Sequence, residues 1–189
     1  MANSKTDIVN HALLALGHRT ILSFNDPSIE AQLARATYDT KRDAVLRAHP
    51  WNFSIKRASI SADSETPAWE FDSQYTMPSD CLRVLELQNE DMDVGRWRIE
   101  GRKILTNIGA PLNIRYIFRN EVVTQYDPLF VEALSFRLAM DWVEPLVKAA
   151  NLKEVMMAAY QEKLSEARTM DGAESTPLKI EADTWIDVR

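Results

Sequence analysis

Residues 25–53 read NDPSIEAQLARATYDTKRDAVLRAHPWNF, and this stretch decides the fold. Asp26-Pro27 is typical of a helix N-cap followed by proline at the first helical position, where the missing N–H costs nothing. Pro50 ends the helical pattern, because the residue before a proline is pushed towards extended geometry. The stretch therefore predicts one long helix that leads directly into a strand.

This long helix has two contrasting faces. On a helical wheel, six apolar or aromatic residues share one arc and five charged residues share the opposite arc, with Lys41 and Leu46 as exceptions. Opposite charges recur three or four residues apart, which is typical of an exposed helix face. The apolar arc contains Leu33, Ala34, Tyr38, Ala44, Val45 and Ala48, and the charged arc contains Arg35, Asp39, Arg42, Asp43 and Arg47.

An aromatic segment follows the helix, and we call it the plug. Its aromatic rings alternate along the chain as the pattern changes to that of a strand. We expect its aromatic side chains to fix the position of the end of the long helix, at the point where the chain enters a sheet. The plug consists of His49, Pro50, Trp51 and Phe53.

Other helices are predicted on both sides of this region. Ser4–Asp7 fits a capping box, Gly17 fits the residue after a helix end, and a short link to the long helix favours a hairpin. Asp127-Pro128 repeats the cap-plus-proline pattern, and Pro145 ends or kinks that helix. Asn151 is expected to cap a last helix over 152–170, with Val155, Ala159, Tyr160, Leu164 and Ala167 on one face.

Between these helices the apolar residues recur at a shorter period. Several short strands separated by turn residues predict a small antiparallel sheet or a sandwich. The predicted strands cover residues 55–60, 82–87, 97–100, 103–106 and 112–119.

Together these patterns predict an α+β protein. We expect an antiparallel helical bundle of two N-terminal and two C-terminal helices, with a small antiparallel β-domain inserted between them and an extended C-terminal arm. The expected boundaries are 1–53 and 120–171 for the bundle, 54–119 for the β-domain and 172–189 for the arm.

The composition limits the classes of function. A net charge of −6 and a pI of about 5.1 argue against a nucleic-acid binder held by a basic face. The single cysteine, Cys81, excludes a disulfide framework within the chain. No signal peptide is recognisable, and no apolar run approaches the ~20 residues that cross a bilayer, so we expect no membrane association.

The last residues are too polar to form a core, yet they carry large apolar side chains. A frayed tail is one interpretation, and an arm that docks on another subunit is the other. We favour the arm, because a tryptophan has little use on a solvated acidic tail. Its docking residues would be Leu178, Ile180, Trp185, Ile186 and Val188.

No catalytic constellation is visible. Phosphate-binding glycine motifs are missing, and His11, His18 and His49 lie far apart. We therefore expect no enzyme activity, no cofactor and no metal site. One cluster of cations could face a phosphate, although it also fits an ordinary charged strand edge. This cluster contains Arg96, Arg98, Arg102 and Lys103.

The chain resembles the tail tubular protein A family of tailed phages over roughly residues 3–171. The most specific motifs are A-H-P-W-N-F at 48–53 and Y-x-x-P-x-D-C-L-R-V at 75–84. D-I-V-N-x-A-L-x-x-L-G at 7–17 and the helical segments 130–139 and 164–168 also fit.

This resemblance implies a function. The family forms the head-to-tail adaptor of short-tailed phages, a ring expected to hold about twelve copies. The implied partners are other copies of the chain, the portal protein, the downstream tail tube or nozzle protein, and genomic DNA that passes through without sequence-specific binding. The implied location is the head-tail interface of the virion, after synthesis in the host cytoplasm.

Two alternatives remain open from the sequence. A DNA-packaging or regulatory accessory protein would carry a helical DNA-binding unit, but its helix would need a basic face and the long helix alternates charge signs. An enzyme with an unrecognised site is the other alternative, and a deep polar pocket would favour it.

Overall fold

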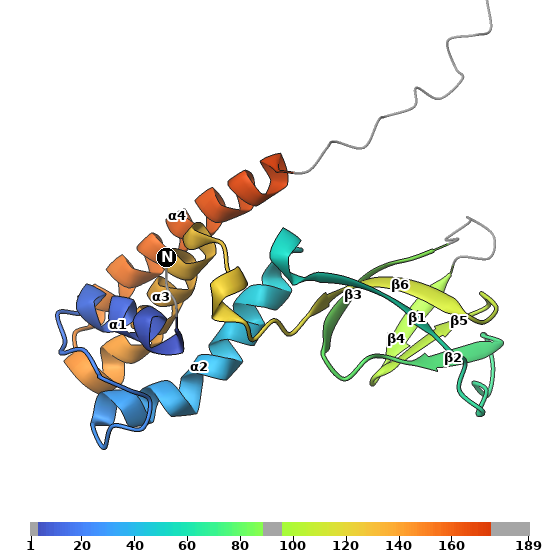
Figure 1. The fold of residues 1–189 in the computed structure, drawn as a ribbon, viewed down its shortest axis with the longest axis horizontal. Helices are drawn as coiled ribbons and strands as arrows, with labels where there is room; N and C mark the ends of the chain where they lie inside the picture. The colour runs from blue at the N-terminus through green and yellow to red at the C-terminus, as the bar shows by residue number, and fades with distance from the viewer. Residues whose placement is uncertain (1–3, 89–95, 175–189) are drawn as a thin grey trace, which may run out of the picture.

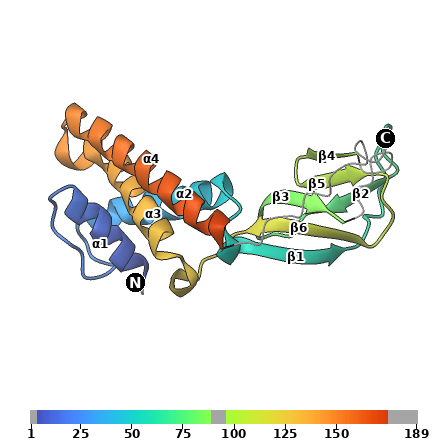
Figure 2. The same ribbon diagram turned by 90° about the horizontal axis from the view of Figure 1, so that it is seen from above.

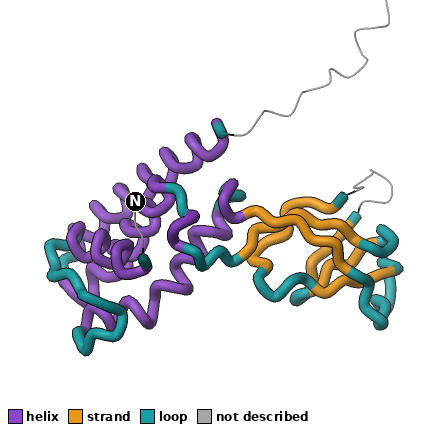
Figure 3. The backbone as a smooth tube through the Cα atoms, viewed as in Figure 1, coloured by secondary structure: helices purple, strands orange, loops and turns teal. Residues whose placement is uncertain are grey.

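The computed structural model describes residues 4–88 and 96–174 and shows a mixed α+β protein with two parts (Figures 1 and 3). The helical part comprises residues 4–53 and 120–174, and the sheet part comprises the described residues of 54–119. The elements are α1 (Lys5–Ala15), α2 (Ile29–Ala48), β1 (Ile55–Ile60), β2 (Ser73–Thr76), β3 (Cys81–Leu87), β4 (Trp97–Glu100), β5 (Lys103–Thr106), β6 (Leu112–Phe118), α3 (Pro128–Trp142) and α4 (Ala150–Ala173).

Helix α3 is the centre of the helical part. It contacts α1, α2 and α4, whereas α1 and α2 contact each other only slightly (Figure 2). The large side chains of Phe130, Leu134, Leu138 and Trp142 are fully buried along it. A helix that is apolar on several sides is stable only when other elements cover those sides, and here three helices do so.

Several predicted helix ends are confirmed. Ser4 and Asp7 form a reciprocal capping box at the start of α1. At its end Gly17 has a φ of 69°, a conformation that glycine adopts without a Cβ clash. Asp127 caps α3 with Pro128 as its first residue, and the chain after Trp142 forms a short π-helical turn that contains Pro145.

The predicted start of α2 is wrong. The helix begins at Ile29 and Ser28 is its N-cap, accepting a hydrogen bond from the backbone N–H of Ala31. The carboxylate of Asp26 instead accepts from the backbone N–H of Leu22 at 2.8 Å. Asp26 therefore closes the preceding turn, and that use competes with the capping role that the sequence pattern favours.

The predicted faces of α2 also need correction. Arg42 lies in the buried stripe and not on the exposed charged face, while Ala44 and Ala48 of the predicted apolar arc are exposed. Leu46, an exception on the wheel, is fully buried. The reason is that α2 contacts both α3 of the helical part and β3 of the sheet part.

The last helix starts earlier than predicted. α4 begins at Ala150 with Ala149 as its N-cap, so Asn151 does not cap it. Val155, assigned to the buried face, is 57% exposed, whereas Met156 is buried. Leu164 and Ala167 are buried as predicted, so the difference is confined to the first turns of the helix.

The sheet part consists of two three-stranded antiparallel sheets. Sheet A has the order β1-β6-β3 and sheet B has the order β2-β5-β4. One apolar cluster contains side chains of both sheets, including Tyr75 and Ile104 of sheet B and Leu112 and Tyr116 of sheet A. The two sheets therefore share a core. Strand β2 was not predicted, because its four residues carry only one buried apolar side chain.

Candidate functional site at the junction of helices and sheets

Two chain segments connect the helical part to the sheet part, and the plug lies in the first of them. The structure places Trp51 fully inside the helical core, while Pro50 is exposed. The indole N–H of Trp51 donates to the carbonyl oxygen of Val45 at 3.0 Å. Its ring packs edge-on against the ring of Phe130 in α3, with 5.1 Å between the two centroids. Phe53 also packs against the Phe130 ring, at a centroid distance of 5.0 Å. The plug therefore joins the end of α2 to α3.

Asp171 near the end of α4 holds the same connection from the outside. Its side chain is 8% exposed, and one carboxylate oxygen accepts from the backbone N–H of Asn52 at 2.9 Å. The other oxygen lies 3.0 Å from Nε2 of His49, and the Asn52 amide donates to the Asp171 carbonyl oxygen at 2.9 Å. The end of α4 is thereby fixed to the first connection.

Asn120 joins the second connection to the first. It is fully buried, and its side-chain amide donates to the carbonyl oxygen of Phe53 at 2.9 Å. The hydroxyl of Tyr126 donates to the Asn120 carbonyl oxygen at 2.6 Å. Burial raises the pKa of Tyr126 to about 12, which is further above neutral pH than the ordinary value of about 10.

A buried arginine forms a third link. The guanidinium of Arg42 lies within 2.8 Å of carboxylate oxygens of Asp39 and Asp43 and 3.4 Å from Glu121, which follows β6. Burial alone would lower the pKa of Arg42, but the hydrogen bond to Asp43 and the nearby charges raise it. Arg119 also pairs with Asp43 at 2.7 Å. Residues of α2 therefore bind both ends of the segment 119–121, which follows β6.

The predicted phosphate-facing cations all have partners within the sheet part. Three form ion pairs of 2.7–3.3 Å with carboxylates, and the fourth donates to a backbone carbonyl. A cation already neutralised by a carboxylate attracts a phosphate less strongly. The partners are Glu70 for Arg96 and Arg98, Asp63 for Lys103, and the carbonyl oxygen of Pro78 for Arg102.

Glu70 has an unusual backbone. Its φ is 71°, and the N–H of Phe71 donates to the carbonyl oxygen of Trp69 at 2.9 Å, which makes a strained three-residue turn. Phe71 is buried on the sheet side of this turn, whereas Trp69 on its other side is 76% exposed. The ion pairs of Glu70 with the two arginines therefore hold a turn that presents a tryptophan to solvent.

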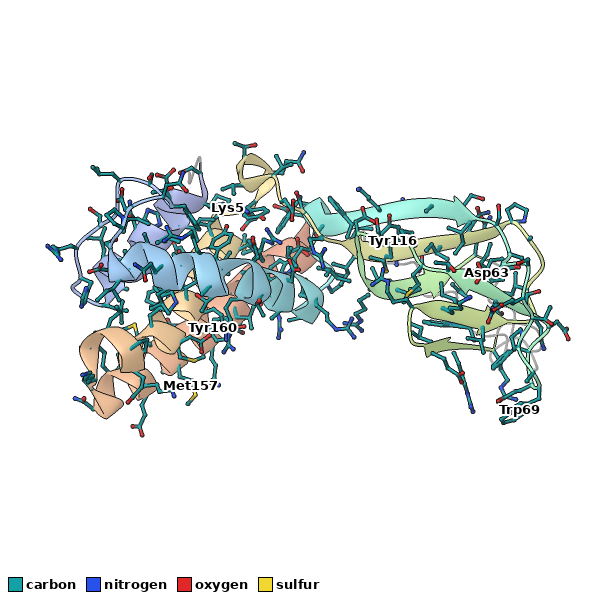
Figure 4. All side chains as sticks on the ribbon, turned by 90° about the horizontal axis from the view of Figure 1, so that it is seen from below. Lys5, Asp63, Trp69, Tyr116, Met157 and Tyr160 are labelled. Carbon is teal, nitrogen blue, oxygen red and sulfur yellow. The ribbon has the colours of Figure 1, made fainter. Side chains whose placement is uncertain are left out.

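Large exposed apolar side chains lie at both ends of the molecule. Figure 4 shows Met157 near the free end of the helical part and Trp69 at the far end of the sheet part. Leu22 and Ile29, which precede and begin α2, are 93% and 70% exposed. The predicted arm residues Leu178, Ile180, Trp185, Ile186 and Val188 lie outside the described residues.

Sequence reasoning missed three residues that build the junction: Arg42, Asn120 and Asp171. Arg42 could be found only by noticing that it lies four residues after Tyr38 on the same helical stripe. Asn120 and Asp171 act through contacts with residues far away in the sequence, so no local pattern marks them.

The described residues show no arrangement that would hold a metal ion, that is, no group of three or more His, Cys, Asp or Glu side chains suited to one. A bilayer-crossing helix would have to be longer or more apolar than any helix in the described ranges. Comparison of the chain with models of known protein families gives no match, and comparison with curated proteins gives none either.

Proposed function

We propose that this protein is a non-catalytic virion component that joins the head of a short-tailed phage to its tail. In this proposal about twelve copies form a ring on the portal protein, and the tail tube or nozzle protein binds on the other side. Genomic DNA passes through the ring without sequence-specific contacts. The proposal starts from the resemblance of the A-H-P-W-N-F and Y-x-x-P-x-D-C-L-R-V motifs to the tail tubular protein A family.

The geometric observation that supports it most is the separation of exposed apolar side chains. Two of these exposed side chains, Met157 and Trp69, lie at opposite ends of an elongated subunit (Figure 4). Exposed aromatic and apolar residues are typical anchors of protein interfaces. A subunit with an anchor at each end is suited to bridging two partners.

The finer architecture belongs to the same proposal. We take the four helices to act as one antiparallel bundle. Since α4 continues to Ala173, past the predicted start of the arm at 172, the extended arm that reaches a neighbouring copy or the portal would comprise only the residues after this helix. The contacts of α3 with the other three helices favour the bundle. The DNA-binding alternative is less well supported, because most cations of the sheet part are already paired with carboxylates.

The decisive experiment is native mass spectrometry of the chain alone and with its cognate portal protein. A discrete multi-copy complex that forms with the portal would support the adaptor function and give its stoichiometry. A monomer or dimer that ignores the portal, combined with salt-dependent binding to duplex DNA, would favour the accessory-protein alternative.

Single variants can test whether each end of the subunit takes part in assembly. Trp69→Ala and Met157→Ala should each weaken assembly without changing the far-UV circular dichroism spectrum, because both side chains are exposed. Ser165→Ala, an exposed position midway along α4, is the matched control. Removal of residues 174–189 should leave the remaining chain folded and abolish assembly.

A further inference from the structure

The outer face of sheet A is hollowed and begins at the end of α4. A hollow of about 550 Å³ is lined by residues of β1, β6 and β3, including Arg57, Glu86 and Arg115. A second hollow of about 370 Å³ is lined by Ile55, Arg115 and Gly172 among others. Because Arg115 lines both, the two form one surface, which we call the sheet A groove.

The chemistry changes along this groove. Near α4 it is lined by the half-buried apolar side chains of Ile55 and Leu85, beside His49, Asn52 and Asp171, whose polar groups already hydrogen-bond one another. Further along β1 it becomes charged: Arg57 is exposed, and among the described residues it has no carboxylate partner. Arg115 lies beside it in the neighbouring strand and pairs with Glu86 at 2.7 Å. An occupant should therefore be apolar first and acidic afterwards.

The chain that follows α4 has this order. Leu178 and Ile180 come first, and Glu181 and Asp183 come next. Extended chain spans at most about 3.3–3.6 Å per residue, so residues 175–189 can reach about 50 Å, which exceeds the length of sheet A. The segment starts beside the groove, because Gly172 lines it, and this tether gives it a high effective concentration there.

We infer that residues 175–189 of the isolated chain dock in the sheet A groove of the same molecule. Leu178 and Ile180 pack near Ile55 and Leu85, and the acidic residues that follow lie towards Arg57. This inference goes beyond the adaptor function, since it concerns the protein before any partner binds. It also implies that an arm engaging another subunit has first to leave this groove.

Paramagnetic relaxation enhancement, measured by NMR on the full-length chain, tests the inference. A nitroxide label on Ser59→Cys, an exposed position on the groove side of β1, should remove most of the NMR signal intensity of the backbone amides of residues 178–185. Cys81 is buried, so the label is directed to the introduced thiol, and the unmodified chain serves as the labelling blank. The same label on Lys153→Cys, at the far end of α4, should leave those signals unchanged.

Charge reversal supplies the second arm of the test. Arg57→Glu should restore the amide intensities in the Ser59→Cys chain, whereas Lys153→Glu should not. Intensities unaffected by the label at position 59, or reduced equally by both labels, would overturn the inference. Broadening seen only between labelled and unlabelled chains in a mixture would also overturn it, because the occupant would then be the segment of a second copy. Ring assembly with the portal is measured separately, by native mass spectrometry. The docking of residues 175–189 and the adaptor function can therefore be contradicted independently of each other.

Discussion

In the helical part, large aromatic side chains are fully buried around α3. The sheet part has its own, smaller apolar cluster, and pairs of charged side chains also hold its loops against the strands. Trp51, Phe130 and Trp142 have no exposed surface in the first part. In the second, Asp63 pairs with Lys103 at 2.7 Å and Asp80 with Lys56 at 2.8 Å. Burial of apolar area contributes far more per residue than partly exposed ion pairs do. The two parts should therefore respond to different perturbations.

The largest effect is expected from Trp51→Ala. Loss of this side chain leaves a cavity among Phe130 and Phe53 and removes the hydrogen bond to Val45. We expect the free energy of unfolding to fall by about 3–5 kcal/mol, measured by urea denaturation followed by circular dichroism. Trp69→Ala is the matched control and should change it by less than about 0.5 kcal/mol, because Trp69 is exposed. Similar losses in both variants would contradict the comparison.

A smaller effect is expected at the junction. Asp171→Ala removes the acceptor of the Asn52 N–H and the contact with His49. Hydrogen bonds to a charged, mostly buried carboxylate support a loss of about 2 kcal/mol in the same denaturation experiment. Glu174→Ala, at an exposed position at the end of α4, should be neutral within about 0.5 kcal/mol. A neutral Asp171→Ala would mean that the end of α4 is not held by this carboxylate.

The sheet part should lose stability in acid through two of its carboxylates, Asp63 and Asp80. The hydrogen bond from Lys103 lowers the pKa of Asp63. Burial alone would raise the pKa of Asp80, but the hydrogen bonds from Lys56 and Tyr116 bring it below its ordinary value. A lowered pKa in the folded state stabilises the protein above the unfolded value of about 3.9, and this stabilisation is lost as the pH falls through the folded values.

The predicted loss of stability at low pH can be checked with the double variant Asp63→Asn/Asp80→Asn. Hydrogen exchange of the strands should accelerate below about pH 4 in the parent chain relative to the intrinsic rate. In the double variant the pH dependence of the strands should be smaller. Helices α3 and α4 should serve as the internal reference, because the carboxylate of the helical part with a lowered pKa, Glu30, lies in α2. Equal acid sensitivity of helices and strands would contradict the assignment of these pairs to the sheet part.

The smallest effect is expected at the strained turn. Glu70→Gly removes two partly exposed ion pairs but relieves the positive φ, so the two changes should offset each other to within about 1 kcal/mol. Glu70→Ala loses the same pairs and keeps the strain, and it should therefore be the less stable variant. Equal stabilities in urea denaturation would show that the turn is not strained in solution.

The sequence predicted those elements whose information is local. The capping box at Ser4, the proline start at Pro128 and the strand over 55–60 depend on neighbouring residues, and the structure has them. The start of α2 was mispredicted because Asp26 and Ser28 are both good caps, and only the turn before the helix decides which one is used.

The candidate site was less predictable for a related reason. The plug could be recognised because aromatic residues around a proline are visible in the sequence, but its partners could not. Asp171 is 122 residues away from His49, and Asn120 is 67 residues away from Phe53. Arg42 was assigned to the exposed face because burial of a charge depends on the carboxylates that surround it in space.

The antiparallel pairing of β1 with β6 has a consequence for how the chain folds. Ile55 lies directly opposite Ile117, so the two ends of the sheet part emerge side by side. Without that pairing, α2 and α3 would have to meet across a flexible loop of about 80 residues, 49–127. With it, only about 16 residues, 49–54 and 118–127, remain between the helices and the paired strands. The difference in loop-closure entropy is about 1.4 kcal/mol. Early formation of sheet A would therefore speed the docking of α2 on α3, and mutations in β6 should slow the folding of helices that they do not touch.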